Sequence, residues 1–184
     1  SYKTILLVRD LRDVMISYIY FAVKNTQHVW KAEGKQAQYQ WLKPYTKQFM
    51  RMDMQQRILY LLDESKPNEL KISASHFMHC VFELPKQQVT LLVRFEDLVG
   101  SRGGGSDQAQ RETFDRIHDF LQLSISKEEL LRIARQKWGS PGTFRSGQIG
   151  EWDKYFTHKT KTAFKESLYG KALIALGYEK DDAW

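Results

Sequence analysis

The chain has 184 residues, 42% of them hydrophobic, which is enough apolar material for one folded domain with a single core. Lys and Arg number 28 against 22 Asp and Glu, so the formal charge is +6, and this favours anionic ligands. No apolar stretch reaches membrane-spanning length, and the single cysteine, Cys80, excludes an internal disulfide and a thiolate metal cluster. We therefore expect a cytoplasmic protein in a reducing compartment.

The stretch from Thr4 to Phe21 combines a strand with a helix. Residues 4–8 are an unbroken apolar run, which predicts a strand buried on both faces, as in a parallel sheet. Asp10 is the expected N-cap of the helix, and Asp13 resembles the acidic arm of a capping box. Because a buried strand needs neighbours and the chain opens almost directly on this one, we expect further sequence upstream.

Two residues of this stretch suit a phosphate. Arg9 is expected at the carboxyl end of the strand, beside a helix start, where open α/β sheets bind anions. Ser17 lies on the same helical stripe as Asp10 and Asp13, and helical side chains lean toward the N-terminus. Arg9 and Ser17 can thus hold one phosphate; the alternative is that Arg9 pairs with one of the two aspartates at the surface.

A second strand is predicted at residues 89–93. It ends in Arg94, Phe95 and an acidic pair, which echoes the first strand, and the long helical crossover between the two predicts parallel neighbours. Their polar ends then share one edge of the sheet. Phe95 either lies against the ring of a ligand or belongs to the core.

Most of the remaining chain has helical spacing. The expected helices are Gln48 to Leu62, Leu70 to Leu84, Gln108 to Leu121, Lys127 to Lys137 and Lys161 to Leu176, the last with Gly177 as its C-cap. Ser126, with Glu129 three residues later, is expected to cap the helix that starts at Lys127. The run Gly103-Gly104-Gly105 lacks a following Lys-Ser/Thr, so we interpret it as a flexible connector capped by Ser106 or Asp107. His76, His79 and Cys80 lie close together, but without further ligands we predict no metal site.

A glycine-rich loop runs from Gly139 to Trp152. Its glycines allow backbone N–H groups to approach an anion closely, and Arg145 supplies positive charge.

These pieces together resemble the PAPS-dependent sulfotransferases (PAPS is 3'-phosphoadenosine 5'-phosphosulfate), in particular their soluble bacterial branch. Val8-Arg9-Asp10 with Ser17 is similar to the family's 3'-phosphate motif, in which an Arg and a Ser eight positions later hold that phosphate. Residues 94–98 look like the strand whose aromatic residue approaches the adenine. Phe144-Arg145-Ser146-Gly147, with Gly150-Glu151-Trp152 after it, resembles the loop that closes over the 3'-phosphate and adenosine.

The resemblance implies a three-layer α/β fold in which helices flank a parallel sheet, related to the P-loop nucleotide kinases. It implies transfer of a sulfuryl group from PAPS to a hydroxyl or amine of a small acceptor, with release of 3',5'-adenosine bisphosphate (PAP), and needs no metal. The residues it assigns to the nucleotide are Arg9, Ser17, Phe95, Trp138, Arg145, Ser146 and Gly147.

Two departures from the family pattern matter. The family's phosphosulfate-binding loop and its catalytic base, often a His, lie upstream of the Arg9 motif, so we assign the role of base to no residue of this chain. We accordingly expect these residues to be the C-terminal portion of a sulfotransferase domain and incomplete for catalysis by themselves. Ser146 also stands where the family usually has Lys, which removes one cation from the phosphate grip.

Two other function classes stay open. An ATP-using relative of the P-loop kinases would also place an Arg at a strand end and a glycine loop nearby. The second class is a non-catalytic remnant that binds nucleotides or nucleic acid through its basic charge. Strongly salt-dependent binding of nucleic acid, without binding of PAP, would favour this class. The acceptor and the oligomeric state are not fixed by the sequence.

Overall fold

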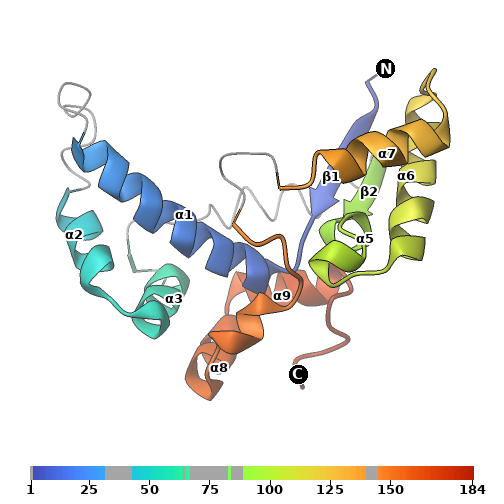
Figure 1. Ribbon diagram of the computed structural model, residues 1–184. Helices are drawn as coiled ribbons and strands as arrows, with labels where there is room; N and C mark the ends of the chain where they lie inside the picture. Colours follow the sequence, from blue (N-terminus) through green and yellow to red (C-terminus); the bar gives the residue numbers. More distant parts are fainter. Residues whose placement is uncertain (1, 32–42, 64, 67–82, 84–88, 140–144) are drawn as a thin grey trace. The chain divides into compact units, whose positions relative to one another are not determined.

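The computed structural model describes residues 2–31, 43–63, 65–66, 83, 89–139 and 145–184 (Figure 1). Within these residues the chain is rich in helix and has one small two-stranded parallel sheet, which is compatible with the predicted α/β class. Two compact units make up the chain. The first combines Ser1–Arg9 with His79–Gly150, and the second combines Asp10–Met78 with Glu151–Trp184.

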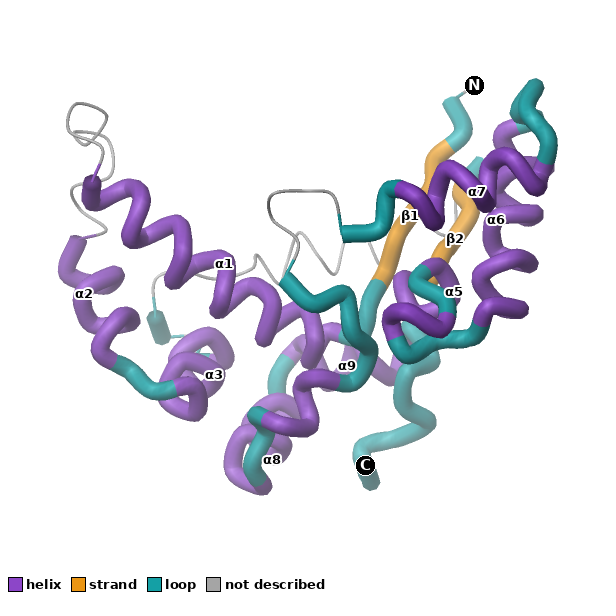
Figure 2. The backbone as a smooth tube through the Cα atoms, in the orientation of Figure 1, coloured by secondary structure: helices purple, strands orange, loops and turns teal. Residues whose placement is uncertain are grey.

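The sheet of the first unit consists of β1 (Thr4–Val8) and β2 (Thr90–Arg94), drawn in orange in Figure 2. The strands run parallel, as predicted, with Val8 opposite Arg94. Burial of β1 on both faces was a wrong prediction, because Leu7 is 55% exposed while Val8 is 3% exposed. This alternation is that of a strand with one covered face.

The helices of the first unit follow β2 closely in sequence. They are α5 (Phe95–Leu98), the 3-10 turn η4 (Ser101–Gly103), α6 (Asp107–Leu121) and α7 (Lys127–Gln136). The hydroxyl of Ser106 accepts the N–H of Ala109, and that of Ser126 accepts the N–H of Glu129, so both expected caps are confirmed. A hydrogen bond also links α6 to β2, because the guanidinium of Arg116 donates to the carbonyl of Leu92.

The second unit is entirely helical in the described residues. It contains α1 (Leu11–Lys31), α2 (Lys43–Arg51), α3 (Met54–Leu62), the 3-10 turn η5 (Glu151–Lys154), α8 (His158–Glu166) and α9 (Leu168–Ala175). Its core forms around Met15, Ile16 and Ile19 of α1, which are at most 1% exposed and pack in one cluster with Ile58 and Phe164. Apolar residues three and four apart place these side chains on one face of α1.

Two helices predicted as continuous are each divided in two. The predicted helix 48–62 breaks before Asp53, whose carboxylate accepts the N–H of Gln56 while Gln56 accepts the N–H of Asp53, a complete capping box. The predicted helix 161–176 breaks at Ser167, whose hydroxyl caps α9. Apolar spacing continues across both breaks, whereas the capping side chains satisfy the N–H groups of a new first turn.

The end of α9 is the one that the sequence predicts. Gly177 has a φ of 71°, and its N–H donates to the carbonyl of Ile174. The N–H of Tyr178 donates to the carbonyl of Leu173, which completes a Schellman motif. No helix among the described residues is long and apolar enough to cross a membrane. Apart from Glu83, the predicted helix 70–84, with His76, His79 and Cys80, lies outside the described residues.

Candidate anion-binding site

The carboxyl ends of β1 and β2 bring Arg9 and Phe95 together in the first unit. Val8 pairs with Arg94, so the next residue of each strand leaves the sheet at the same edge. The guanidinium carbon of Arg9 lies 4.3 Å from the centre of the Phe95 ring, a cation–π contact. Phe95 therefore supports a cation at the strand ends, and both side chains are only partly buried.

The loop at residues 145–150 docks against Arg9. The Nη2 atom of Arg9 donates to the backbone carbonyl of Gln148 at 2.8 Å. The amide of Gln148 donates in turn to the carbonyl of Arg102 at 2.9 Å and more weakly to that of Ser146 at 3.4 Å. These bonds tie the segment that carries Arg145 to the strand end that carries Arg9.

The glycine run after α5 shapes the other side of this loop. A Cβ atom on Gly103 would lie 2.5 Å from the Cβ of Val99 and 2.8 Å from the carbonyl oxygen of Gly147, so only glycine fits. The carbonyl of Gly103 accepts the N–H of Ile149 at 3.0 Å. The run is thus a close-packed turn, and the predicted flexible connector was wrong because backbone contacts with the 145–150 loop hold it.

The turn is also fixed from α6. The carboxylate of Asp107 accepts the N–H of Ser101 at 2.8 Å, and this hydrogen bond lowers the pKa of Asp107. The side chain of Gln110, which is buried, donates to the carbonyl of Leu98 at 2.7 Å. Helix α6 therefore positions the turn on which the 145–150 loop rests.

The predicted site residues fall in both units. The first unit contains Arg9, Phe95, Trp138, Arg145, Ser146 and Gly147, and the second contains Ser17. Arg145 and Ser146 are partly buried, and Gly147 has a φ of 64°, a conformation that suits glycine. Trp138 lines a pocket with helices α6 and α7, and Ser17 lies partly buried on α1.

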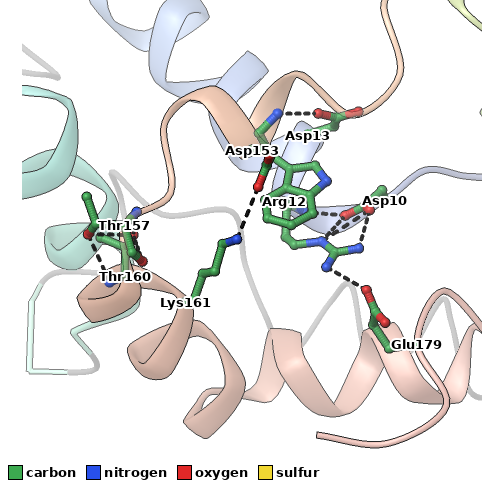
Figure 3. A network of polar contacts seen from close by, with 9 residues as sticks. Asp10, Arg12, Asp13, Asp153, Thr157, Thr160, Lys161 and Glu179 are labelled. Carbon is green, nitrogen blue, oxygen red and sulfur yellow. Dashed lines mark hydrogen bonds and ion pairs between the residues drawn. The ribbon is translucent and has the colours of Figure 1, made fainter. Parts of the chain in front are cut away.

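The two aspartates that share a helical stripe with Ser17 serve the structure of the second unit. Asp10 caps α1, since its carboxylate accepts the N–H of Arg12 at 2.9 Å. Asp13 is 1% exposed and accepts the N–H of Trp152 at 2.9 Å (Figure 3). Both carboxylates thus accept hydrogen bonds that stabilise the second unit.

Arg12 forms the centre of this polar network, and the sequence analysis missed it. Its guanidinium donates to Asp10 at 2.6 Å and to Glu179 at 2.6 Å (Figure 3). The same group lies 4.0 Å from the ring centre of Trp152 and 4.5 Å from that of Trp184. Burial lowers the pKa of Arg12, but the hydrogen bonds and charges of Asp10 and Glu179 outweigh it and raise the pKa.

The chain was compared with known protein families, proteins and structures. A scan against protein-family models, a search of curated proteins and a search of solved structures each found no match.

The arrangement suits an anion attached to a flat ring. Arg9 offers a planar guanidinium at the strand ends, and Arg145 lies three residues before the carbonyl that holds Arg9. Guanidinium groups bind phosphate oxygens in pairs, and the Phe95 ring provides an apolar surface beside them. In the part of the chain that the structure describes, no group of three or more His, Cys, Asp or Glu could hold a metal ion.

Sequence reasoning also missed the backbone carbonyls of Gln148 and Arg102, which accept hydrogen bonds from Arg9 and from the side-chain amide of Gln148. A carbonyl is common to every residue, so no side-chain pattern marks these positions.

Proposed function

We propose that this chain binds PAP and its sulfated precursor PAPS as part of a sulfotransferase. The observation that carries the proposal is the contact of Arg9 with both the Phe95 ring and the loop that contains Arg145. Three motifs that are far apart in the sequence were assigned to one nucleotide, and members of all three lie in one compact unit.

The residues present fit the nucleotide in their chemistry. Arg9 and Arg145 supply guanidinium donors for the 3'-phosphate, and the positive φ of Gly147 suits a loop whose N–H group turns toward an anion. Phe95 supplies an apolar surface for the adenine, and Trp138 and the hydroxyls of Ser17 and Ser146 are the remaining assigned contacts.

PAPS carries the activated sulfuryl group, which passes to a hydroxyl or amine of a small acceptor. The role of this chain's residues is to bind and orient the non-reacting end of the nucleotide, because a fixed 3'-phosphate and adenine place the reacting group. The proposal includes a three-layer α/β fold, with helices on both sides of a parallel sheet, that is related to the fold of P-loop kinases. It also includes a cytoplasmic location, because the sequence has a single cysteine, Cys80.

Calorimetric titration with three nucleotides tests this function. We expect PAP to bind at least about tenfold more tightly than adenosine 5'-monophosphate, since the loss of one charge-assisted contact costs about 1.5 kcal/mol or more. ATP, which has no 3'-phosphate, should also bind more weakly than PAP. Equal affinity for PAP and the monophosphate would contradict the proposal, and a preference for ATP would favour a kinase relative.

A further inference from the structure

A second basic site lies within the first unit, in a cavity of about 460 Å³ that is lined by residues of η4, α6 and α7 and by Trp138. The charged and aromatic residues that line it are Arg102, Arg111, Glu128, Arg132, Arg135 and Trp138. Neither Arg9 nor Phe95 lines this cavity, and Trp138 is the one residue that it shares with the residues assigned to the nucleotide. Cavities of this size hold small ligands.

The lining has a strong excess of positive charge. Four guanidinium groups meet a single lining carboxylate, that of Glu128. Arg132 also forms two hydrogen bonds with Glu129, at 2.6 and 2.8 Å, and these raise the pKa of Arg132. Glu129 thus offsets the charge of Arg132 and Asp107 offsets part of the charge of Arg102 and Arg135, but arginines still outnumber the acidic residues of the lining, and this attracts an anion.

Local hydrogen bonds orient two of the guanidiniums. The Nε atom of Arg135 donates to the side-chain oxygen of the buried Gln110 at 2.9 Å. The Nη1 atom of Arg102 donates to the carbonyl of Arg135 at 3.2 Å. A guanidinium has five N–H donors, so one bond at each residue fixes its plane and leaves other N–H groups for oxygens of an anion.

We propose that this cavity binds a ligand that carries two or more phosphate or sulfate groups. Several guanidiniums around one cavity match several anionic groups, because each planar fork takes two oxygens of a phosphate or sulfate. Trp138 provides the aromatic part of the wall, which suits the apolar or ring portion of such a ligand.

Titration of the full chain with inorganic pyrophosphate and inorganic phosphate tests this site. We expect pyrophosphate to bind at least about tenfold more tightly, because it meets more than one guanidinium. Binding should shift the indole N–H signal of Trp138 in a nitrogen–proton correlation spectrum, and a Trp138→Phe variant assigns that signal. Equal affinity for the two anions, or no shift of this signal, would overturn the proposal.

Matched substitutions on one helix locate the binding. Arg111→Gln should weaken pyrophosphate binding about tenfold, whereas Arg116→Gln, an identical charge change on α6 outside the cavity, should change it less than about twofold. Circular dichroism of each variant checks that α6 stays folded. Equal losses in the two variants would mean that the protein attracts anions only through its net charge.

Two further arms separate this site from the proposed nucleotide site and identify the ligand's source. Arg111→Gln should leave PAP binding unchanged, because Arg111 lines this cavity and is not among the residues assigned to the nucleotide. Equal losses of PAP and pyrophosphate binding in Arg111→Gln would mean that one site binds both ligands, and would overturn the second site. A sugar bisphosphate and a disulfated disaccharide then compare phosphate with sulfate esters. The compound that binds more tightly shows whether the natural ligand carries phosphate or sulfate esters. If neither compound binds more tightly than inorganic phosphate, the inference is contradicted.

Discussion

Replacement of Arg12 should destabilise the second unit, because this side chain is buried among charged and aromatic partners. Its side chain is 5% exposed, and those of its partners Asp10 and Glu179 are 10% and 21% exposed. Arg12→Met removes the cation but keeps much of the apolar stem, so two carboxylates lose their shared partner in a largely dry site. The two indole rings that enclose the guanidinium also lose their cation–π contacts.

The expected cost follows from this geometry. Breaking a buried ion pair by removing one partner costs about 3 to 5 kcal/mol, and the partial exposure of Glu179 places this site near 3 kcal/mol. Arg12→Lys retains the charge and loses the planar fork, so we expect about half that cost. Glu179→Gln should cost about 1 to 2 kcal/mol alone but close to nothing in the Arg12→Met background, since the cation is then already absent.

Urea unfolding followed by tryptophan fluorescence measures these values. A Trp138→Phe background confines the signal to the second unit, where the other tryptophans of the sequence lie. Lys161→Met is the matched control, because Lys161 also lies over the Trp152 ring and pairs with an acid, Asp153, but at an exposed position. That control should cost at most about 1 kcal/mol. If Arg12→Met costs no more than Lys161→Met, the network does not stabilise the unit in the way described.

Three other outcomes follow from single positions. Ser146→Lys should tighten PAP binding by about 1 kcal/mol, less at high salt, and leave adenosine 5'-monophosphate unaffected; equal gains for both ligands would remove this loop from the 3'-phosphate. Gly103→Ala should destabilise the first unit by about 1 to 3 kcal/mol and weaken PAP binding. Gly104→Ala, whose Cβ meets nothing closer than 3.9 Å, strains the backbone at a φ of 83° but should spare PAP binding; titrations of both variants decide this. Hydrogen bonds to Asp119 and then to the carbonyl of Ile125 raise the pKa of His118 above its ordinary 6.5, so its stabilising effect is full below pH 6.5 and is lost as the pH rises through the raised pKa; an NMR titration should give a midpoint above 6.5 that falls in Asp119→Asn, and equal midpoints would contradict it.

Strands and helix caps were the most predictable parts of this chain. A five-residue run of Thr and aliphatic residues followed by Arg predicted both β1 and β2, and their parallel pairing followed from the helical segment between them. Ser106 and Ser126 marked the starts of α6 and α7 because a hydroxyl satisfies N–H groups that the first helical turn leaves without helical partners.

The internal breaks and the buried network were harder to predict. Asp53 and Ser167 interrupt apolar patterns that continue in the next helix, so periodicity alone joined what capping separates. Arg12 looked like an ordinary charged residue of a helix start, and only the folded unit places Glu179, far along the sequence, against it. Long-range partners of this kind leave no local pattern.

The candidate site also has parts that the sequence predicted and parts that it did not. Arg9 and Phe95 were predictable as neighbours because parallel strands end at a common edge. The turn at Gly103 looked flexible, since sequence shows glycines but not the carbonyl of Gly147 that excludes any side chain there. The cavity lined by Arg102, Arg111, Arg132 and Arg135 could not be predicted, because only the packing of α6 against α7 brings these residues together.

The most direct measurement of the central claim is a cycle of calorimetric titrations that combines two ligands with Arg9→Ala. Our account predicts that this change weakens PAP binding by about 1.5 to 3 kcal/mol and alters binding of adenosine 5'-monophosphate by less than about twofold, since only PAP carries the 3'-phosphate that Arg9 contacts. Arg116→Ala, an exposed arginine of the same unit, should affect neither ligand. If Arg9→Ala weakens both ligands equally, Arg9 does not bind the 3'-phosphate, and the proposed nucleotide site is wrong.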